Sequence, residues 1–118
     1  MTHVRVTVRN PTDPSKFWKG LFLVDTGAYD SLVPAKHLKK LGLKSRGKQA
    51  YELADGSQVD MKVTTGELEL MGRIVGNTII FGGDNAEPIL GVTALESAGV
   101  EVDPRTRRLK RLPAVRLK

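Results

Sequence analysis

A short apolar strand that ends in an Asp-Thr-Gly turn is the feature that most constrains this chain. Residues 21–24 are all apolar and lead directly into Asp25, Thr26, Gly27 and Ala28. Glycine lets the backbone turn where a Cβ atom would clash, so we expect the strand to stop abruptly with the Asp25 carboxylate just beyond it. The Thr26 hydroxyl can donate to a nearby backbone carbonyl and lock this turn. The small Ala28 leaves room beside the carboxylate.

A single aspartate at the end of an apolar strand indicates a functional role for its carboxylate. An ionised carboxylate is rarely found against apolar neighbours unless it is paired with another group or put to use. The Asp-Thr-Gly triplet occurs once in the 118 residues. A mechanism that needs two such carboxylates would therefore need two copies of the chain.

Composition and length predict one soluble globular domain over residues 1–118, with a basic C-terminal segment from about residue 104. Hydrophobic residues make up 40% of the chain and charged residues 27%, which is ordinary for such a domain. Cysteine is absent, which excludes disulfides, thiolate nucleophiles and cysteine-ligated zinc. The two histidines, His3 and His37, stand alone and give no zinc-binding spacing. We therefore expect no cofactor and no metal.

The sequence also gives an expectation for location. No apolar run approaches the roughly 20 residues that a membrane-spanning helix needs. The first residues alternate in polarity and lack the apolar core of a signal peptide. The lack of cysteine suits a reducing compartment. We expect a cytoplasmic protein with no membrane partner.

The net charge of +6 raises the question of nucleic acid. Much of the excess lies in Arg105, Arg107, Arg108, Lys110, Arg111, Arg116 and Lys118. These cations could contact phosphate, or they could belong to a solvated hairpin and tail. No aromatic residue lies among them to stack on bases. We favour the solvated hairpin and expect no nucleic-acid partner, while binding through this segment stays open as an alternative.

Alternation of apolar and polar residues predicts a chain made mostly of short strands. The expected strands cover residues 4–8, 17–24, 66–72, 73–81, 100–102 and 109–112, with a turn cluster at 10–15. A hairpin turn is expected at Ala54, Asp55, Gly56 and Ser57, because Asp-Gly between alternating runs is a strong hairpin signal.

Two short helices interrupt the strands. The first is predicted over residues 34–41, where proline suits the start and Gly42 suits the left-handed residue that closes a helix. The second is expected to begin at Thr93 with a capping box to Glu96 and to end at Gly99. Short strands, glycine turns and two short helices together indicate an all-β, barrel-like domain.

Residues 23–28, followed downstream by Ile89, Leu90 and Gly91, make the chain resemble the retropepsin-like (clan AA) aspartic proteases. The resemblance extends over roughly residues 4–102. It implies a small closed acid-protease barrel that works as a homodimer. It also implies that Ile89, Leu90 and Gly91 pass beside the Asp-Thr-Gly loop and brace it.

The same resemblance assigns the hairpin at residues 54–57 to the flap that closes over a bound peptide in this family. Gly56 is the one glycine at its tip. The implied partners are a second copy of the chain and a peptide or protein substrate.

An aspartic endopeptidase is the function that the resemblance implies. Two facing Asp25 residues, one from each subunit, would share one proton, so that one carboxylate activates water and the other protonates the substrate. The alternative is a non-proteolytic dimerisation or peptide-binding module on the same fold. The bulky Tyr29 after Ala28 and the basic C-terminal segment motivate that alternative.

Three further residues carry expectations of their own. Asp30 is expected to be a structural partner for an arginine rather than a third catalytic acid. His37 lies among lysines and is expected on an exposed, solvated helix face. Trp18 is expected to pack at the barrel surface or at a subunit contact.

Overall fold

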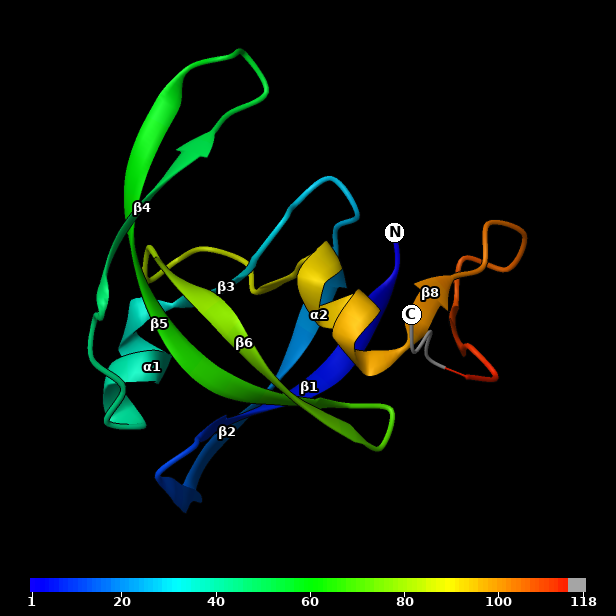
Figure 1. The fold of residues 1–118 in the computed structure, drawn as a ribbon, viewed down its shortest axis with the longest axis horizontal. Coiled ribbons are helices and arrows are strands. Elements are labelled where there is room, and N and C mark those ends of the chain that lie inside the picture. Colours follow the sequence, from blue (N-terminus) through cyan, green and yellow to red (C-terminus); the bar gives the residue numbers. More distant parts are fainter. Residues whose placement is uncertain (115–118) are drawn as a thin grey trace.

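The computed structural model describes residues 1–114. Within them the chain forms nine strands and two short helices (Figure 1). Their bounds are β1 (His3–Asn10), β2 (Asp13–Val24), β3 (Ser31–Pro34), α1 (Ala35–Lys40), β4 (Gly47–Glu52), β5 (Gln58–Leu70), β6 (Arg73–Gly82), β7 (Ile89–Leu90), α2 (Val92–Ala98), β8 (Val100–Val102) and β9 (Leu109–Arg111). The mainly β architecture that the sequence predicts is confirmed.

Seven strands form one sheet in the order β1-β2-β7-β3-β6-β5-β4. The sheet closes because β1 also pairs antiparallel with β5, with Val8 opposite Leu68. Two pairs are parallel, β2 with β7 and β3 with β6, and the other pairs in this sheet are antiparallel. The first half of β5 and its partner β4 extend past the closed part as a long hairpin (Figure 1).

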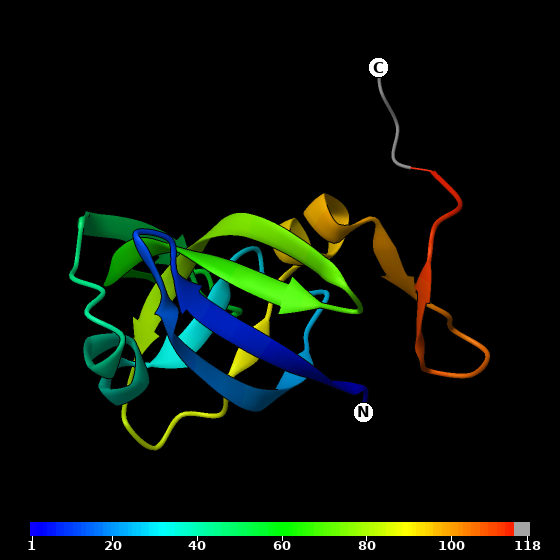
Figure 2. The ribbon, with the colours of Figure 1, turned by 90° about the horizontal axis from the view of Figure 1, so that it is seen from below.

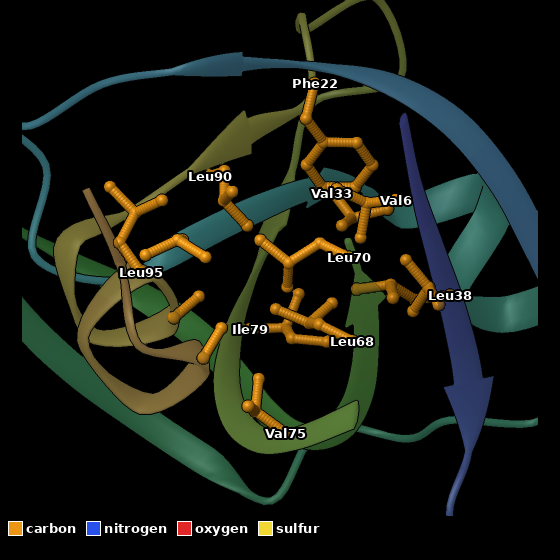
Figure 3. Close-up of a cluster of buried hydrophobic side chains, with 14 of the residues drawn as sticks. Val6, Phe22, Val33, Leu38, Leu68, Leu70, Val75, Ile79, Leu90 and Leu95 are labelled. Carbon is orange, nitrogen blue, oxygen red and sulfur yellow. The ribbon is translucent and has the colours of Figure 1, made fainter. Parts of the chain in front are cut away.

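The core fills the inside of this closed sheet. Alternation in β1 buries Val6 and Val8, as the two-residue period predicts. Figure 3 shows the side chains of Phe22, Leu68 and Leu90 pointing into the same interior from different strands. Each side chain of this size contributes about 1.5–3 kcal/mol when it is fully buried. The packed interior gives the strand ends fixed positions.

Several element boundaries differ from the sequence prediction, among them the start of β2, the start of α2 and the expected strand 66–72, which is the second half of β5 and ends at Leu70. Strand β2 begins at Asp13, inside the predicted turn cluster, because Asn10 pairs directly with Asp13 and the turn needs only residues 11–12. Helix α2 begins at Val92 with Gly91 as its N-cap and has no side-chain cap. The predicted capping box at Thr93 is wrong, because that hydroxyl lies 2.8 Å from Oδ1 of Asn77 instead.

Other predictions about the helices are confirmed. Helix α1 falls within the predicted range, and Gly42 follows it with a φ of 78°. Gly99 closes α2 in the left-handed conformation with a φ of 68°. Glycine adopts these angles at no steric cost, which is why both helices end where the sequence indicates.

The prediction for His37 is wrong. Its ring stacks on the indole of Trp18, with ring centroids 4.0 Å apart and an interplanar angle of 13°. Loss of hydration lowers the pKa of His37 below its ordinary value of 6.5, and the positive charges of Lys36 and Lys40 lower it further. Trp18 also packs against Phe22 of the core, so its predicted packing role at the surface is confirmed.

Strands β8 and β9 form a separate two-stranded sheet that projects from the barrel (Figure 2). Lys110 and Glu101 pair across it at 3.2 Å. The turn between the strands carries exposed Arg105, Arg107 and Arg108. The cations Arg116 and Lys118 of the predicted basic segment lie outside the described residues.

Candidate active site

Asp25 follows directly on the last residue of β2, where the neighbouring strand β7 fixes the backbone. Strand β7 runs parallel to β2, with Leu23 beside Ile89 and Val24 beside Leu90. The Asp25 N–H donates to the Leu90 carbonyl at 3.1 Å. The structure therefore places the Ile89-Leu90 segment immediately beside the strand that delivers the aspartate.

The Asp-Thr-Gly turn is held by the aspartate itself. The Gly27 N–H donates to Oδ1 of Asp25 at 2.9 Å, and the Ala28 N–H donates to the Asp25 carbonyl at 3.1 Å. Asp25 is half-buried, whereas Thr26 and Gly27 are exposed. Within residues 1–114 the Thr26 hydroxyl makes no hydrogen bond, so the expected lock by Thr26 on its own subunit is wrong. Oδ1 of Asp25 is thus oriented by the turn, whereas Oδ2 accepts no hydrogen bond within residues 1–114.

Gly91 explains how the two chain segments approach so closely. A Cβ atom at Gly91 would lie 2.5 Å from the backbone carbonyl carbon of Asp30, far inside van der Waals contact. The Gly91 N–H donates to the buried Ser31 hydroxyl at 3.0 Å, and the Val92 N–H donates to the Ala28 carbonyl at 2.8 Å. The segment after the turn is therefore hydrogen-bonded to the start of α2.

A cleft of about 500 Å³ lies between this loop and the β4–β5 hairpin. Its apolar lining is Ala28, Leu32, Ala50, Leu53, Val59, Met61 and Ile80, and its polar lining includes Tyr29, Asp30, Gln49 and Glu52. A cleft with apolar walls and few polar groups is typical of a ligand-binding site. Its lining also includes Gly27, whose N–H donates to the Asp25 carboxylate.

The tip of the hairpin is a tight polar turn. Leu53 and Ser57 bond through their backbones at 2.7 Å, and the Ser57 N–H and hydroxyl both donate to Oδ1 of Asp55. These bonds lower the pKa of Asp55, with the Ser57 hydroxyl as the main cause. Ala54 and Gly56 are exposed, and residues 54–57 do not line the cleft of the single chain.

A family model described as gag-polyprotein putative aspartyl protease matches residues 19–97, which is more than half of the chain. The chain belongs to this family. It is a retropepsin-like aspartic protease, an aspartic-type endopeptidase, and this membership favours the protease over the non-proteolytic module. The β8–β9 hairpin lies beyond the matched residues.

Solved structures of viral proteases share the fold of this chain. The EIAV protease in complex with the inhibitor HBY-793 has a TM-score of 0.61 and 22% sequence identity, covering 86% of this chain and 90% of that one. The solution structure of simian foamy virus (mac) protease has a TM-score of 0.56 and 14% identity, covering 79% and 90%. A search of curated proteins finds no match to the chain.

Asp30 is a buried acid whose partner differs from the one that the sequence predicts. Asp30 is only 6% exposed, and its Oδ2 accepts a hydrogen bond of 2.7 Å from the Tyr51 hydroxyl. The expected arginine partner is wrong, because no Arg or Lys pairs with Asp30 within residues 1–114. Burial, together with the Asp30 carboxylate, raises the pKa of Tyr51 above its ordinary value.

Tyr51 is the site residue that sequence reasoning missed. It stands in an ordinary alternating strand, and no spacing rule connects it with a residue 21 positions earlier. Only the pairing of β3 with β6, of β6 with β5 and of β5 with β4 brings Tyr51 beside Asp30. Tyr29, by contrast, is 65% exposed and lies along the cleft wall without filling it.

Two further features of the described residues concern metal ions and membrane spans. Among residues 1–114, no group of three or more histidine, aspartate or glutamate side chains is arranged to hold a metal ion. The same residues include no helix long and apolar enough to cross a membrane.

Proposed function

We propose that this protease cleaves peptide bonds through a water molecule activated by two Asp25 carboxylates, one from each subunit of a homodimer. The observation that carries the proposal is the single Asp-Thr-Gly turn per chain, with Oδ1 of Asp25 bonded to Gly27 and the carboxylate only half-buried. One carboxylate alone is a weak apparatus for amide hydrolysis. A two-fold axis through the turn would supply the second.

The chemistry follows from the charge of the pair. Two adjacent carboxylates do not both ionise comfortably, so they share one proton. The ionised Asp25 takes a proton from water while the water oxygen bonds to the substrate carbonyl carbon. The protonated Asp25 donates to the carbonyl oxygen, which gives a tetrahedral diol. Cleavage of the C–N bond then requires proton transfer to the leaving amine, and the dyad returns to its shared-proton state.

A surface suited to the second subunit lies next to the turn. Exposed Thr26 borders a groove of about 400 Å³ between α2 and the β8–β9 hairpin. Its apolar residues include Val92, Val102 and Leu112. If two Asp25 side chains meet, Thr26 and this groove come to the boundary between the subunits. The free Thr26 hydroxyl would then bond to the loop of the partner.

The β4–β5 hairpin would act as the flap. A peptide that enters the cleft as an added strand would lie between this hairpin and the Asp-Thr-Gly loop, where backbone hydrogen bonds give affinity. The flap role of Ala54, Asp55, Gly56 and Ser57 belongs to this proposal, because these residues do not line the cleft of the single chain.

Mixing subunits tests the dyad directly. Asp25→Asn is expected to abolish cleavage of an unfolded protein while dimerisation, measured by sedimentation, stays intact. A mixture of wild-type and Asp25→Asn subunits should lose activity with the fraction of mixed dimers, because each mixed dimer has one carboxylate. Activity of the mixture in proportion to wild-type subunits would contradict a shared site.

The cytoplasmic location expected from the sequence is kept as part of this proposal. Cell fractionation with an antibody to the chain would test it.

A further inference from the structure

The buried carboxylate of Asp30 has no cation beside it. A buried aspartate is normally stabilised by a positive partner or by several donors, because loss of hydration disfavours its charge. The ion pairs within residues 1–114 are His3 with Glu87, Arg9 with Glu69, and Lys110 with Glu101. None of them involves Asp30, which is 6% exposed.

A count of its hydrogen bonds shows which oxygen is underused. Oδ2 accepts from the Tyr51 hydroxyl at 2.7 Å. The Thr93 hydroxyl lies 3.3 Å from Oδ1 of Asp30 and 2.8 Å from Oδ1 of Asn77. A hydroxyl has one proton to donate, and the shorter contact takes it. Oδ1 of Asp30 therefore keeps capacity to accept from a further donor.

The underused carboxylate borders a polar cavity. This cavity has a volume of about 350 Å³ and adjoins the cleft, since Tyr29, Asp30 and Gln49 line both. Its other walls include Thr65, Asn77 and Thr78. The lining is rich in oxygen acceptors and holds no lysine, arginine or histidine.

We propose that this cavity is a specificity subsite that takes a lysine or arginine side chain of the peptide substrate. The inference rests on the proposed function, because it assumes that peptides occupy the adjoining cleft. The cationic head would pair with Oδ1 of Asp30 and donate to the amide oxygens around it. Tyr29, which is 65% exposed between cleft and cavity, presents an aromatic ring over which the side chain can pass.

The net charge of the whole chain opposes binding of a basic side chain. A measured preference for such side chains would therefore point to a local site. The chain carries a net charge of +6 and repels cationic peptides at a distance. Any preference for a basic side chain must therefore arise locally. A buried ion pair is screened little by salt, so the preference should persist when the ionic strength is raised.

Binding to the inactive Asp25→Asn dimer separates this inference from the proposed chemistry. The probe is a positional library of decapeptides, retained peptides being sequenced after capture. We expect lysine and arginine to be enriched at one position, and the enrichment to fall about tenfold when Asp30→Asn is added. Asp84→Asn, which removes an exposed negative charge outside the cavity, the cleft and the β4–β5 hairpin, is the matched control and should leave the enrichment unchanged.

A second variant covers the case in which Asp30→Asn does not fold. Asn77→Asp adds a carboxylate to the cavity and should strengthen the enrichment of basic residues. Absence of basic enrichment at every position, binding of no peptide at all, or enrichment that survives Asp30→Asn would each overturn the subsite. Failure of the wild-type enzyme to cleave peptides that the Asp25→Asn dimer binds would overturn the dyad and leave the subsite standing.

Discussion

The hydroxyl of Tyr51 lies 2.7 Å from Oδ2 of Asp30, so the β4 strand is bonded to the chain just beyond the Asp-Thr-Gly turn. Tyr51 pairs with Val59 close to the turn of the β4–β5 hairpin, so this contact joins the outer part of the hairpin to the floor of the cleft. The two walls between which we propose that the substrate binds are therefore connected near the hairpin turn, while residues 53–57 of the turn itself remain exposed.

Replacing Tyr51 with phenylalanine should weaken both the fold and substrate binding. The change removes the main donor to a buried carboxylate, which costs about 1–3 kcal/mol in the free energy of unfolding. It also frees the outer part of the hairpin from the floor of the cleft, so KM should rise more than kcat falls. Urea denaturation and steady-state kinetics measure the two effects. Tyr29→Phe is the control for stability, because Tyr29 is exposed, and it should change the unfolding free energy by less than about 0.5 kcal/mol.

Gly91→Ala should disrupt the close approach of the Gly91 segment to the chain that follows the Asp-Thr-Gly turn. The added Cβ would meet the Asp30 backbone at 2.5 Å, and a backbone cannot move aside as the end of a long side chain can. We expect a loss of more than about 3 kcal/mol of stability or failure to fold. Gly83→Ala is the matched control, since its Cβ would meet nothing within 4 Å. Equal thermal midpoints for both variants would show that the close approach at Gly91 is not needed.

Thr26→Ala tests the boundary between subunits. Because the Thr26 hydroxyl has no partner within residues 1–114, the unfolding of a monomer should be almost unchanged. In the proposed dimer two such hydroxyls bond across the axis, at about 0.5–1.5 kcal/mol each. The dimer dissociation constant from sedimentation should therefore rise by about 5- to 150-fold. Thr7→Ala, in the middle of β1, should leave it unchanged.

Acidification should destabilise the fold through His37. Its pKa is lowered in the folded protein, mainly by loss of hydration against Trp18, so the unfolded chain binds the proton more readily. The stabilisation is complete above pH 6.5 and is lost as the pH falls below that value. His37→Phe keeps the stacked ring but cannot titrate. Its urea midpoint should fall less than that of the wild type between pH 7 and pH 5, and equal slopes would contradict this origin.

Local patterns were sufficient for most of the fold. The alternation in residues 4–8, the Asp-Gly hairpin signal and the glycines at 42 and 99 each act within a few residues, and all four appear in the structure as expected. The position of the Asp-Thr-Gly turn is equally local, because an apolar strand followed by Gly27 can end in few other ways.

Three of the errors share one cause, which is side-chain contact between segments distant in sequence. The Thr93-x-x-Glu96 pattern reads as a capping box, yet Asn77 of β6 lies within 2.8 Å of the Thr93 hydroxyl. Asp30 accepts a hydrogen bond from Tyr51 and does not pair with an arginine. His37 of α1 stacks on Trp18 of β2. No local spacing encodes these pairs, because barrel closure decides which side chains meet.

The carbonyl that holds the Asp25 backbone belongs to Leu90, which the ribosome adds long after the aspartate. The Asp25 backbone gains this partner only after the chain has been made as far as β7, and pairing between such remote segments is slow to form. Translation products that stop before β7 can still form the hydrogen bonds within the Asp-Thr-Gly turn, but they lack the support that Leu90 gives to the strand end.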